Sequence, residues 1–88
     1  MGYKYLVIDT KLRQLPIIFP DILCHVDVAR AICVLLAKSN PEAKAVSAGD
    51  IGIEVLECSG ESETLGLTAL PTDKPLIDLF PIFHGVKY

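Results

Sequence analysis

Tyr3–Asp9 reads YKYLVID, and Gln14–Phe19 reads QLPIIF after the short polar segment TKLR. Aromatic and β-branched residues alternate along the first stretch, which is typical of a β-strand with one better-buried face. The second stretch is also apolar, so the two together predict a β-hairpin. Pro16 has no backbone N–H to donate, which predicts that the second strand lies at a sheet edge or is irregular there.

A helix is predicted directly after this hairpin. Pro20 and Asp21 indicate its start, because Asp is a good N-cap and a favourable residue in the first turn. Apolar residues then recur at intervals of four, three, four and three, namely Ile22, Val26, Ala29, Cys33 and Leu36. Asn40–Pro41 ends the helix. Because residues 32–36 are apolar all the way round, this end is expected to contact the sheet and a second surface.

Short strands dominate the second half of the chain. Ala43–Ile51 and Ile53–Ser59 are predicted as two strands joined at residues 50–52. The pair Val55–Leu56 breaks strict alternation, as happens at a β-bulge or in a strand buried on both faces. The sequence then predicts a polar turn over residues 59–64 and a short strand over residues 65–70. A short helix over residues 71–80 and a docked apolar tail over residues 81–88 follow.

The predicted element order is β-β-α-β-β-β-α within a single domain spanning residues 1–88. Strands that precede and follow one long helix, without regular β-α alternation, are typical of the α+β class. We therefore expect a small antiparallel-type sheet with the helices packed on one face.

The composition predicts an oligomer. Hydrophobic residues make up 51 % of the chain, and they include 12 Leu, 9 Ile and 7 Val. A chain of this length buries only about 60–65 % of the surface that its unfolded form exposes. A monomer would therefore leave much aliphatic surface in water. We expect a homo-oligomer whose subunit interface includes much of Ile32–Ala37 and Pro81–Val86.

Charge is distributed unevenly along the sequence. The net charge is −3, which disfavours a DNA-binding protein that neutralises phosphates. The segment from Ala45 to Asp73 contains no Lys or Arg and has six acidic residues, which are Asp50, Glu54, Glu57, Glu61, Glu63 and Asp73. This segment is either an acidic functional face or a solvated strand face that keeps the protein soluble.

No segment predicts a membrane helix, because the longest apolar run, Ala31–Ala37, is far shorter than the roughly 18 residues required. The first residues become charged too early for a secretory signal, so we expect a cytoplasmic protein without membrane contacts. Three cysteines without paired spacing predict reduced thiols. Scattered Cys and His residues also predict no metal site, and we expect no cofactor.

Two basic side chains on the predicted helix are candidates for ligand binding. His25, near the helix start, either contacts an anion beside free helix N–H groups or has a capping or surface role. Arg30 either pairs with Asp27 or binds a carboxylate or phosphate of a ligand. Cys24 cannot act with His25 as a nucleophile–base pair, because adjacent helical residues point about 100° apart.

Hydroxyl groups supply the remaining candidate ligand contacts. The stretch SGESETLGL (residues 59–67) allows close approach of a ligand to the backbone, yet its two glutamates and missing lysine depart from a phosphate loop. A polar hairpin loop is the alternative. The candidate hydrogen-bonding residues are Ser47, Ser59, Ser62 and Thr64, with Tyr3 or Tyr5 stacking on a base. No catalytic motif occurs, so we do not expect an enzyme.

Three segments resemble a set of small uncharacterised proteins encoded by phages and prophages. They read FPDILCHVDVARAI (19–32), AVSAGDI (45–51) and CSGESETLGL (58–67), and Pro71 and Asp73 follow. The family pattern is F-P…H-x-x-V-A-R-A, a V-S-A-G strand, a C-x-G-E-S-x-x-L-G-L strand and a final Pro–Asp helix. The resemblance carries no assigned activity. It implies a small accessory protein that acts in an infected bacterium, where many such proteins inhibit host defence.

Three functions are consistent with these features. The first is a non-catalytic homo-oligomer that binds and sequesters a nucleotide-derived immune signal through Arg30, His25 and the hydroxyl groups. The second is an inhibitor of a host defence or nucleic-acid-processing enzyme, which it contacts through the acidic segment between Asp50 and Glu63. The third is a structural phage component that oligomerises.

Overall fold

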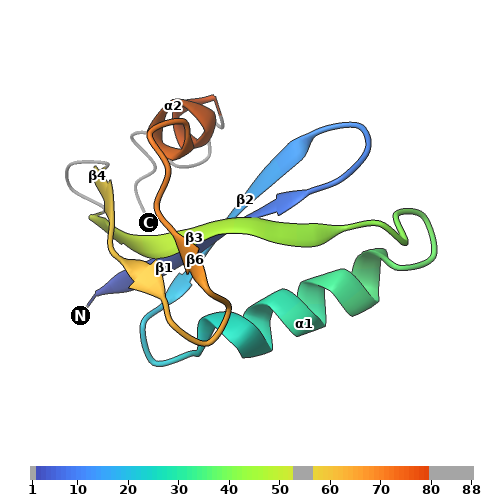
Figure 1. Ribbon diagram of the computed structural model, residues 1–88, viewed down its shortest axis with the longest axis horizontal. Coiled ribbons are helices and arrows are strands. Elements are labelled where there is room, and N and C mark those ends of the chain that lie inside the picture. Colours follow the sequence, from blue (N-terminus) through green and yellow to red (C-terminus); the bar gives the residue numbers. More distant parts are fainter. Residues whose placement is uncertain (1, 53–56, 80–88) are drawn as a thin grey trace, which may run out of the picture.

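The computed structural model describes residues 2–52 and 57–79. These residues form two sheets and two helices in the order expected for the α+β class (Figure 1). The elements are β1 (Tyr3–Asp9), β2 (Gln14–Pro20), α1 (His25–Leu36), β3 (Lys44–Gly52), β4 (Glu57–Ser59), β5 (Glu61–Ser62), β6 (Leu67–Thr68) and α2 (Asp73–Asp78). The predicted fold class is confirmed.

The main sheet has four antiparallel strands in the order β2-β1-β3-β4. The β1–β2 hairpin is the predicted one, and Pro16 lies on β2 at the edge of the sheet, where a missing N–H costs least. β1 pairs on both sides, and its four consecutive residues Tyr5–Ile8 are all buried. The pairing of β1 with β3 shifts between Val7 and Ile8, which marks a β-bulge.

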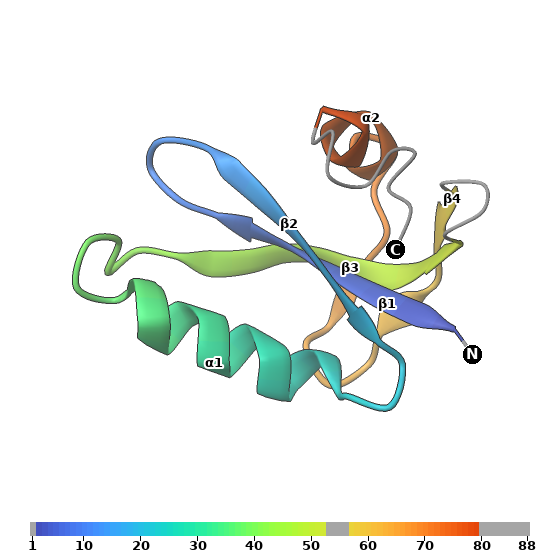
Figure 2. The ribbon, with the colours of Figure 1, turned by 180° about the vertical axis from the view of Figure 1, so that it is seen from behind.

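The two helices cover opposite faces of the main sheet. Side chains on β1 alternate between faces, so Leu6 packs with Ala29 of α1, whereas Tyr5 and Val7 pack with Ile77 of α2. Figures 1 and 2 show α1 on one side of the sheet and α2 on the other. The expectation that both helices share one face is therefore corrected: β1 is buried on both faces because each face has its own helix.

The first helix begins at His25, four residues later than Asp21 suggested. The Asp21 carboxylate instead accepts a hydrogen bond from the backbone N–H of Gly2 at 3.1 Å, and Cys24 occupies the N-cap without a side-chain bond. Ile22 lies in the preceding turn and is 85 % exposed. From there the predicted stripe is confirmed, because its members in the helix are buried or half-buried, namely Val26, Ala29, Cys33 and Leu36.

The C-terminal half of α1 is open to solvent on its outer side. Ile32 is half-buried, but Val34 and Leu35 are 70 % and 77 % exposed. The apolar surface expected to form part of a subunit interface is thus largely exposed at Val34 and Leu35. The other expected interface segment, residues 81–86, lies outside the described residues, as does the pair Val55–Leu56.

The second sheet is a short hairpin formed by β5 and β6, in which Ser62 pairs with Leu67. β5 lies within the segment predicted as a polar turn, and the predicted strand over residues 65–70 is reduced to the two residues of β6. Gly66 has a φ of +66°, a left-handed conformation that turns the chain between the two strands. The hairpin sits beside α1, with Leu65 and Leu67 against the core on that face of the main sheet.

Candidate functional site

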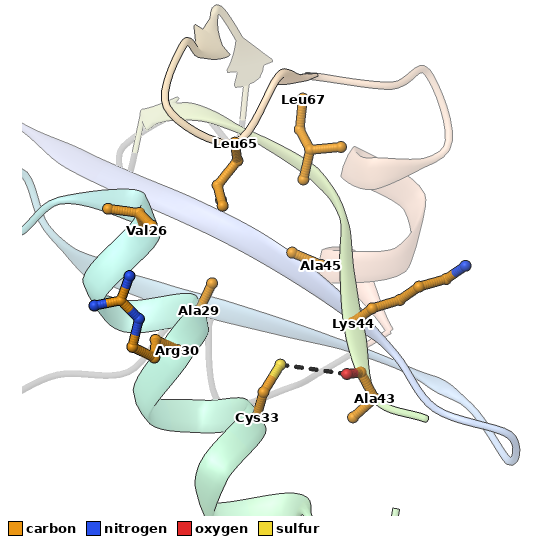
Figure 3. Close-up of a pocket in the computed structure, with 9 residues that line it drawn as sticks. All are labelled: Val26, Ala29, Arg30, Cys33, Ala43, Lys44, Ala45, Leu65 and Leu67. Carbon is orange, nitrogen blue, oxygen red and sulfur yellow. Dashed lines mark hydrogen bonds between the residues drawn. The ribbon is translucent and has the colours of Figure 1, made fainter. Parts of the chain in front are cut away.

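A groove of about 320 Å³ opens between α1, the start of β3 and the connection from β5 to β6 (Figure 3). One flank comes from α1, because residues spaced by three and four lie on the same side of a helix. These residues are Val26, Ala29, Arg30 and Cys33. The helical periodicity that packs α1 on the sheet therefore also places these four residues along the groove.

The opposite flank combines the first residues of β3 with two leucines. Ala43, Lys44 and Ala45 lie along it, and Leu65 and Leu67 close one end. The backbone N–H of Ala43 donates to the carbonyl of Asn40 at 3.0 Å, so this turn brings the chain back alongside α1. The alanine side chains are small, which leaves the space between helix and strand unfilled.

A cysteine ties the two flanks together. The Sγ of Cys33 donates a hydrogen bond to the backbone carbonyl of Ala43 at 3.4 Å (Figure 3). This thiol is thus engaged with the backbone, and no histidine is among the described residues that line the groove. The described part of the groove accordingly has no nucleophile–base pair of the kind used in covalent catalysis.

Two cations flank this apolar surface. Figure 3 shows Arg30 and Lys44 on opposite sides of the groove, with the guanidinium and the ammonium pointing outward from its apolar floor. Among the described residues the ion pairs are Lys11–Glu42 and Lys74–Asp78, so Arg30 does not pair with Asp27. No carboxylate is among the described residues that line the groove. The groove therefore has an apolar floor with one cation on each side.

Of the six predicted site residues, the structure brings only Arg30 into this groove. His25 is buried instead, with Nε2 hydrogen-bonded to the carbonyl of Gly49 at 2.9 Å. Its ring also meets that of Phe19 edge to face, at a centroid distance of 5.5 Å. Both contacts join α1 to the sheet, so this imidazole is a structural part of the core.

The three hydroxyl residues of the second half also lie apart from the groove floor. Ser59 is exposed on β4, in a shallow depression beside Asp50 and Glu57. Ser62 is buried, and its Oγ lies 3.3 Å from the Oγ1 of Thr64. The same Ser62 Oγ accepts the backbone N–H of Leu65 at 3.4 Å. Ser62 and Thr64 therefore shape the turn that presents Leu65 to the groove.

Ser47 takes part in a buried cluster on the α2 side of the sheet. Its Oγ donates to Oδ1 of Asp73 at 2.8 Å, and the backbone N–H of Leu70 donates to Oδ2 at 2.8 Å. The hydroxyl of Tyr5 donates to the same Oδ2. Asp73 is 2 % exposed, so its carboxylate is held by these donors rather than by water. Tyr5 is fully buried, which removes it as a stacking platform for a base.

Burial in this cluster keeps two nearby groups protonated. Desolvation raises the pKa of Tyr5 far above its ordinary value, and the hydrogen bond to Asp73 raises it further. Desolvation also raises the pKa of Cys58, again with a contribution from the Asp73 charge. A thiol with a raised pKa is a poor nucleophile at neutral pH. The cluster thus joins α2 to the sheet and offers no activated group.

Two residues of these clusters, Lys44 and Asp73, were not predicted as site residues from the sequence. Lys44 is the last base before the acidic segment, and its place after Asn40–Pro41, at the start of β3, was the available signal. Asp73 was interpreted as one of the acidic residues of that segment and as part of the final Pro–Asp helix. Its burial depends on Tyr5 and Ser47, which are distant in the chain, so no local pattern reports it.

The described residues contain no group of three or more His, Cys, Asp or Glu side chains placed to hold a metal ion. The three cysteines, Cys24, Cys33 and Cys58, are free thiols. Within the described ranges, neither helix is long and apolar enough to cross a membrane.

Comparison with protein-family models, with curated proteins and with solved structures finds no match for this chain. The resemblance to small phage proteins therefore stays a prediction.

Proposed function

We propose that this protein is a non-catalytic binding protein that holds a small nucleotide-derived anion in the groove beside α1. The observation that carries the proposal is the pair of cations, Arg30 and Lys44, on opposite rims of an apolar hollow with no carboxylate among its described lining. Neither cation has an ion-pair partner among the described residues. Both are therefore available to a phosphate, with Arg30 able to bind it through two parallel hydrogen bonds.

A nucleotide derivative matches both properties of the groove. Its phosphates would lie against the cations, and its base would cover the apolar surface formed by Leu65, Leu67 and the alanines. The volume of about 320 Å³ is at the lower end of the range for small-molecule sites. A part of a dinucleotide fits such a hollow better than the whole molecule, which favours a ligand shared between two subunits.

The phage-type resemblance supplies the biological setting of the proposal. A homo-oligomer in the cytoplasm of an infected bacterium would lower the free concentration of a nucleotide immune signal without altering it chemically. This role needs stoichiometric binding and no catalytic group. It is consistent with the engaged thiol of Cys33 in the groove.

Thermal-shift screening followed by calorimetry tests the proposal, with cyclic dinucleotides, cyclic trinucleotides and ADP-ribose as probes. A probe that binds should raise the melting temperature. Arg30→Ala and Lys44→Ala should each lower the affinity for that probe at least about tenfold, since hydrogen bonds to charged groups contribute roughly 1.5–3 kcal/mol. Arg13→Ala is the matched control, because it removes an exposed arginine that does not line the groove. No shift with any probe, or equal losses in Arg13→Ala and Arg30→Ala, would overturn the proposal.

A second candidate function rests on an acidic depression at the other end of the sheet. Asp21, Asp50 and Glu57 line it, together with the half-buried Tyr3. Three carboxylates around one concave surface are suited to a basic protein surface, such as a nucleic-acid channel. This arrangement favours the alternative in which the protein inhibits a host enzyme by occupying that channel.

Charge reversal separates the two candidates. Asp50→Lys and Glu57→Lys should abolish inhibition of bacterial defence in an infection assay if the acidic depression is the active surface, and inhibition should also fall steeply with added salt. Arg30→Ala should then have no effect. The opposite pattern, with loss only in Arg30→Ala, supports the groove.

A further inference from the structure

The outer side of α1 carries a continuous stripe of exposed residues. Along the helix and its final turn it consists of Asp27, Arg30, Ala31, Val34, Leu35 and Lys38, all of them exposed. Val34 and Leu35 are 70 % and 77 % exposed, and Ala31 forms the floor of a hollow between larger neighbours. An exposed aliphatic strip edged by charges is typical of a protein–protein contact.

The stripe lies directly opposite the face of α1 that packs on the sheet. At about 100° per residue, the buried Ala29 and the half-buried Leu36 point to one side of the helix, and Ala31 and Val34 point to the other. The helix is thus apolar on two opposite sides. Within the part of the chain that the structure describes, only the inner side is packed against the sheet.

The spacing of the residues in the stripe is symmetric. Its intervals are 3, 1, 3, 1 and 3 residues, which read the same in both directions. If a second α1 lies antiparallel to the first, Asp27 faces Lys38 of the partner subunit, and Ala31 faces the partner's Val34. Arg30 then lies beside the partner's Leu35, where its aliphatic stem can pack while its guanidinium stays in water. The acidic residue stands at one end of the stripe and the basic residue at the other, about 16 Å apart along the helix axis at 1.5 Å per residue.

We propose that this stripe binds a second copy of the chain, so that two α1 helices pack antiparallel across a twofold axis between Ala31 and Val34. Each Val34 enters the hollow above the partner's Ala31, and two Asp27–Lys38 pairs set the direction. A twofold contact of this kind requires a surface that matches itself. The symmetric spacing and the opposite charges of Asp27 and Lys38 meet that requirement.

The size of the surface predicts a weak dimer. One pair of short helices buries less than the roughly 1,200 Å² of a standard stable interface, so we expect a dimer that dissociates on dilution. Arg30 borders both this stripe and the groove described above. Dimerisation therefore places both grooves beside the same pair of helices. The dimer itself does not depend on ligand binding.

Sedimentation velocity of the full chain over a range of concentrations tests the proposal at low salt. The unmodified protein should shift from monomer to dimer, and Leu35→Glu should weaken the dimer at least tenfold. Leu12→Glu is the matched control, because Leu12 is 86 % exposed in the turn after β1 and lies outside the stripe. Circular dichroism would confirm that each variant retains its fold.

A charge swap tests the antiparallel direction. Asp27→Lys alone should weaken the dimer about tenfold, because it places like charges opposite Lys38 twice in each dimer. The double variant with Asp27→Lys and Lys38→Asp should return to within threefold of the unmodified protein. A monomer at all concentrations, equal weakening by the substitutions at Leu12 and Leu35, or no recovery in the double variant would each overturn the proposal.

Discussion

Tyr5 and Asp73 are 68 residues apart in the sequence and meet at a buried hydrogen bond between the central strand and the second helix. Ser47 Oγ and the Leu70 backbone N–H donate to the same carboxylate. Three donors thus converge on an acid that has almost no contact with water. Because α2 has only six residues, this cluster and the burial of Ile77 hold it on the sheet.

Removing the carboxylate should therefore destabilise the fold strongly. Asp73→Ala is expected to lower the free energy of unfolding by about 3 kcal/mol or more, since each buried donor left without an acceptor costs about 1–3 kcal/mol. Urea unfolding followed by circular dichroism measures the change. Glu42→Ala is the control, because it removes only the exposed pair with Lys11 and should cost less than about 1 kcal/mol. Similar losses in both variants would contradict the role of Asp73.

The same cluster predicts a loss of stability at alkaline pH. Burial raises the pKa of both Tyr5 and Cys58 in the folded protein, so folding favours their protonated forms. A group with a raised pKa contributes its full stability below its unfolded pKa and loses it as pH rises above that value. With respect to these two groups, stability should thus be level up to about pH 8, then decline as the unfolded Cys and, at higher pH, the unfolded Tyr ionise.

Tyr5→Phe isolates the contribution of the hydroxyl group to that decline. At neutral pH it should cost about 1–2 kcal/mol, because Asp73 loses one donor, and above pH 10 its curve should fall less steeply than that of the unmodified protein. Urea unfolding at intervals from pH 7 to 11 gives both quantities. Tyr3→Phe should retain the unmodified profile, since Tyr3 lies outside the cluster. An equally steep decline in Tyr5→Phe would argue against this origin.

Local sequence patterns predicted the secondary structure correctly where the residues of one element were sufficient to determine it. Alternation and a short polar turn were enough for the β1–β2 hairpin, and the helical spacing of Val26, Ala29 and Cys33 correctly placed the inner side of α1. The helix start was misplaced because Asp21 bonds to Gly2, a contact between distant segments. The opposite placement of the helices follows from the four consecutive buried residues of β1, a tertiary property that periodicity alone did not reveal.

The candidate site was harder to predict, because its parts come from three separate segments. Arg30 could be selected as an isolated base on an apolar helix, and it lies in the groove. His25 is also a basic residue on the same predicted helix, yet it faces the sheet and is hydrogen-bonded to the carbonyl of Gly49. The difference is one of direction around the helix. His25 lies four residues before the buried Ala29 and therefore on the inner side of α1, whereas Arg30 lies at the edge of that side.

His25→Ala should consequently act on stability rather than on ligand binding. The substitution removes a buried hydrogen bond to Gly49 and an edge-to-face contact with Phe19, and we expect a loss of about 2–3 kcal/mol. Thermal and urea unfolding measure that loss, while calorimetry on the folded fraction measures affinity for any probe that binds. Unchanged stability with weaker binding would instead assign His25 to the ligand site.

Gly49→Ala tests the close packing of β3 against its neighbours. A Cβ at this position would lie 2.3 Å from the backbone oxygen of Ser59 and 3.1 Å from Cε1 of Tyr5. Because the nearest atom belongs to the backbone of β4, relief requires movement of a strand, and we expect a loss of about 2–3 kcal/mol.

Gly66→Ala provides the contrast, since a Cβ there would meet nothing within 4 Å and only its left-handed φ of +66° opposes the change. That conformation costs an alanine about 1–2 kcal/mol. Urea unfolding of the two variants side by side should therefore rank Gly49→Ala as the more destabilising. Gly49→Ala should also shift the near-ultraviolet signal of Tyr5, because the added methyl group presses on its ring, whereas Gly66→Ala should leave that signal unchanged. The reverse order of stability would mean that β3 and β4 do not approach as closely as this packing requires.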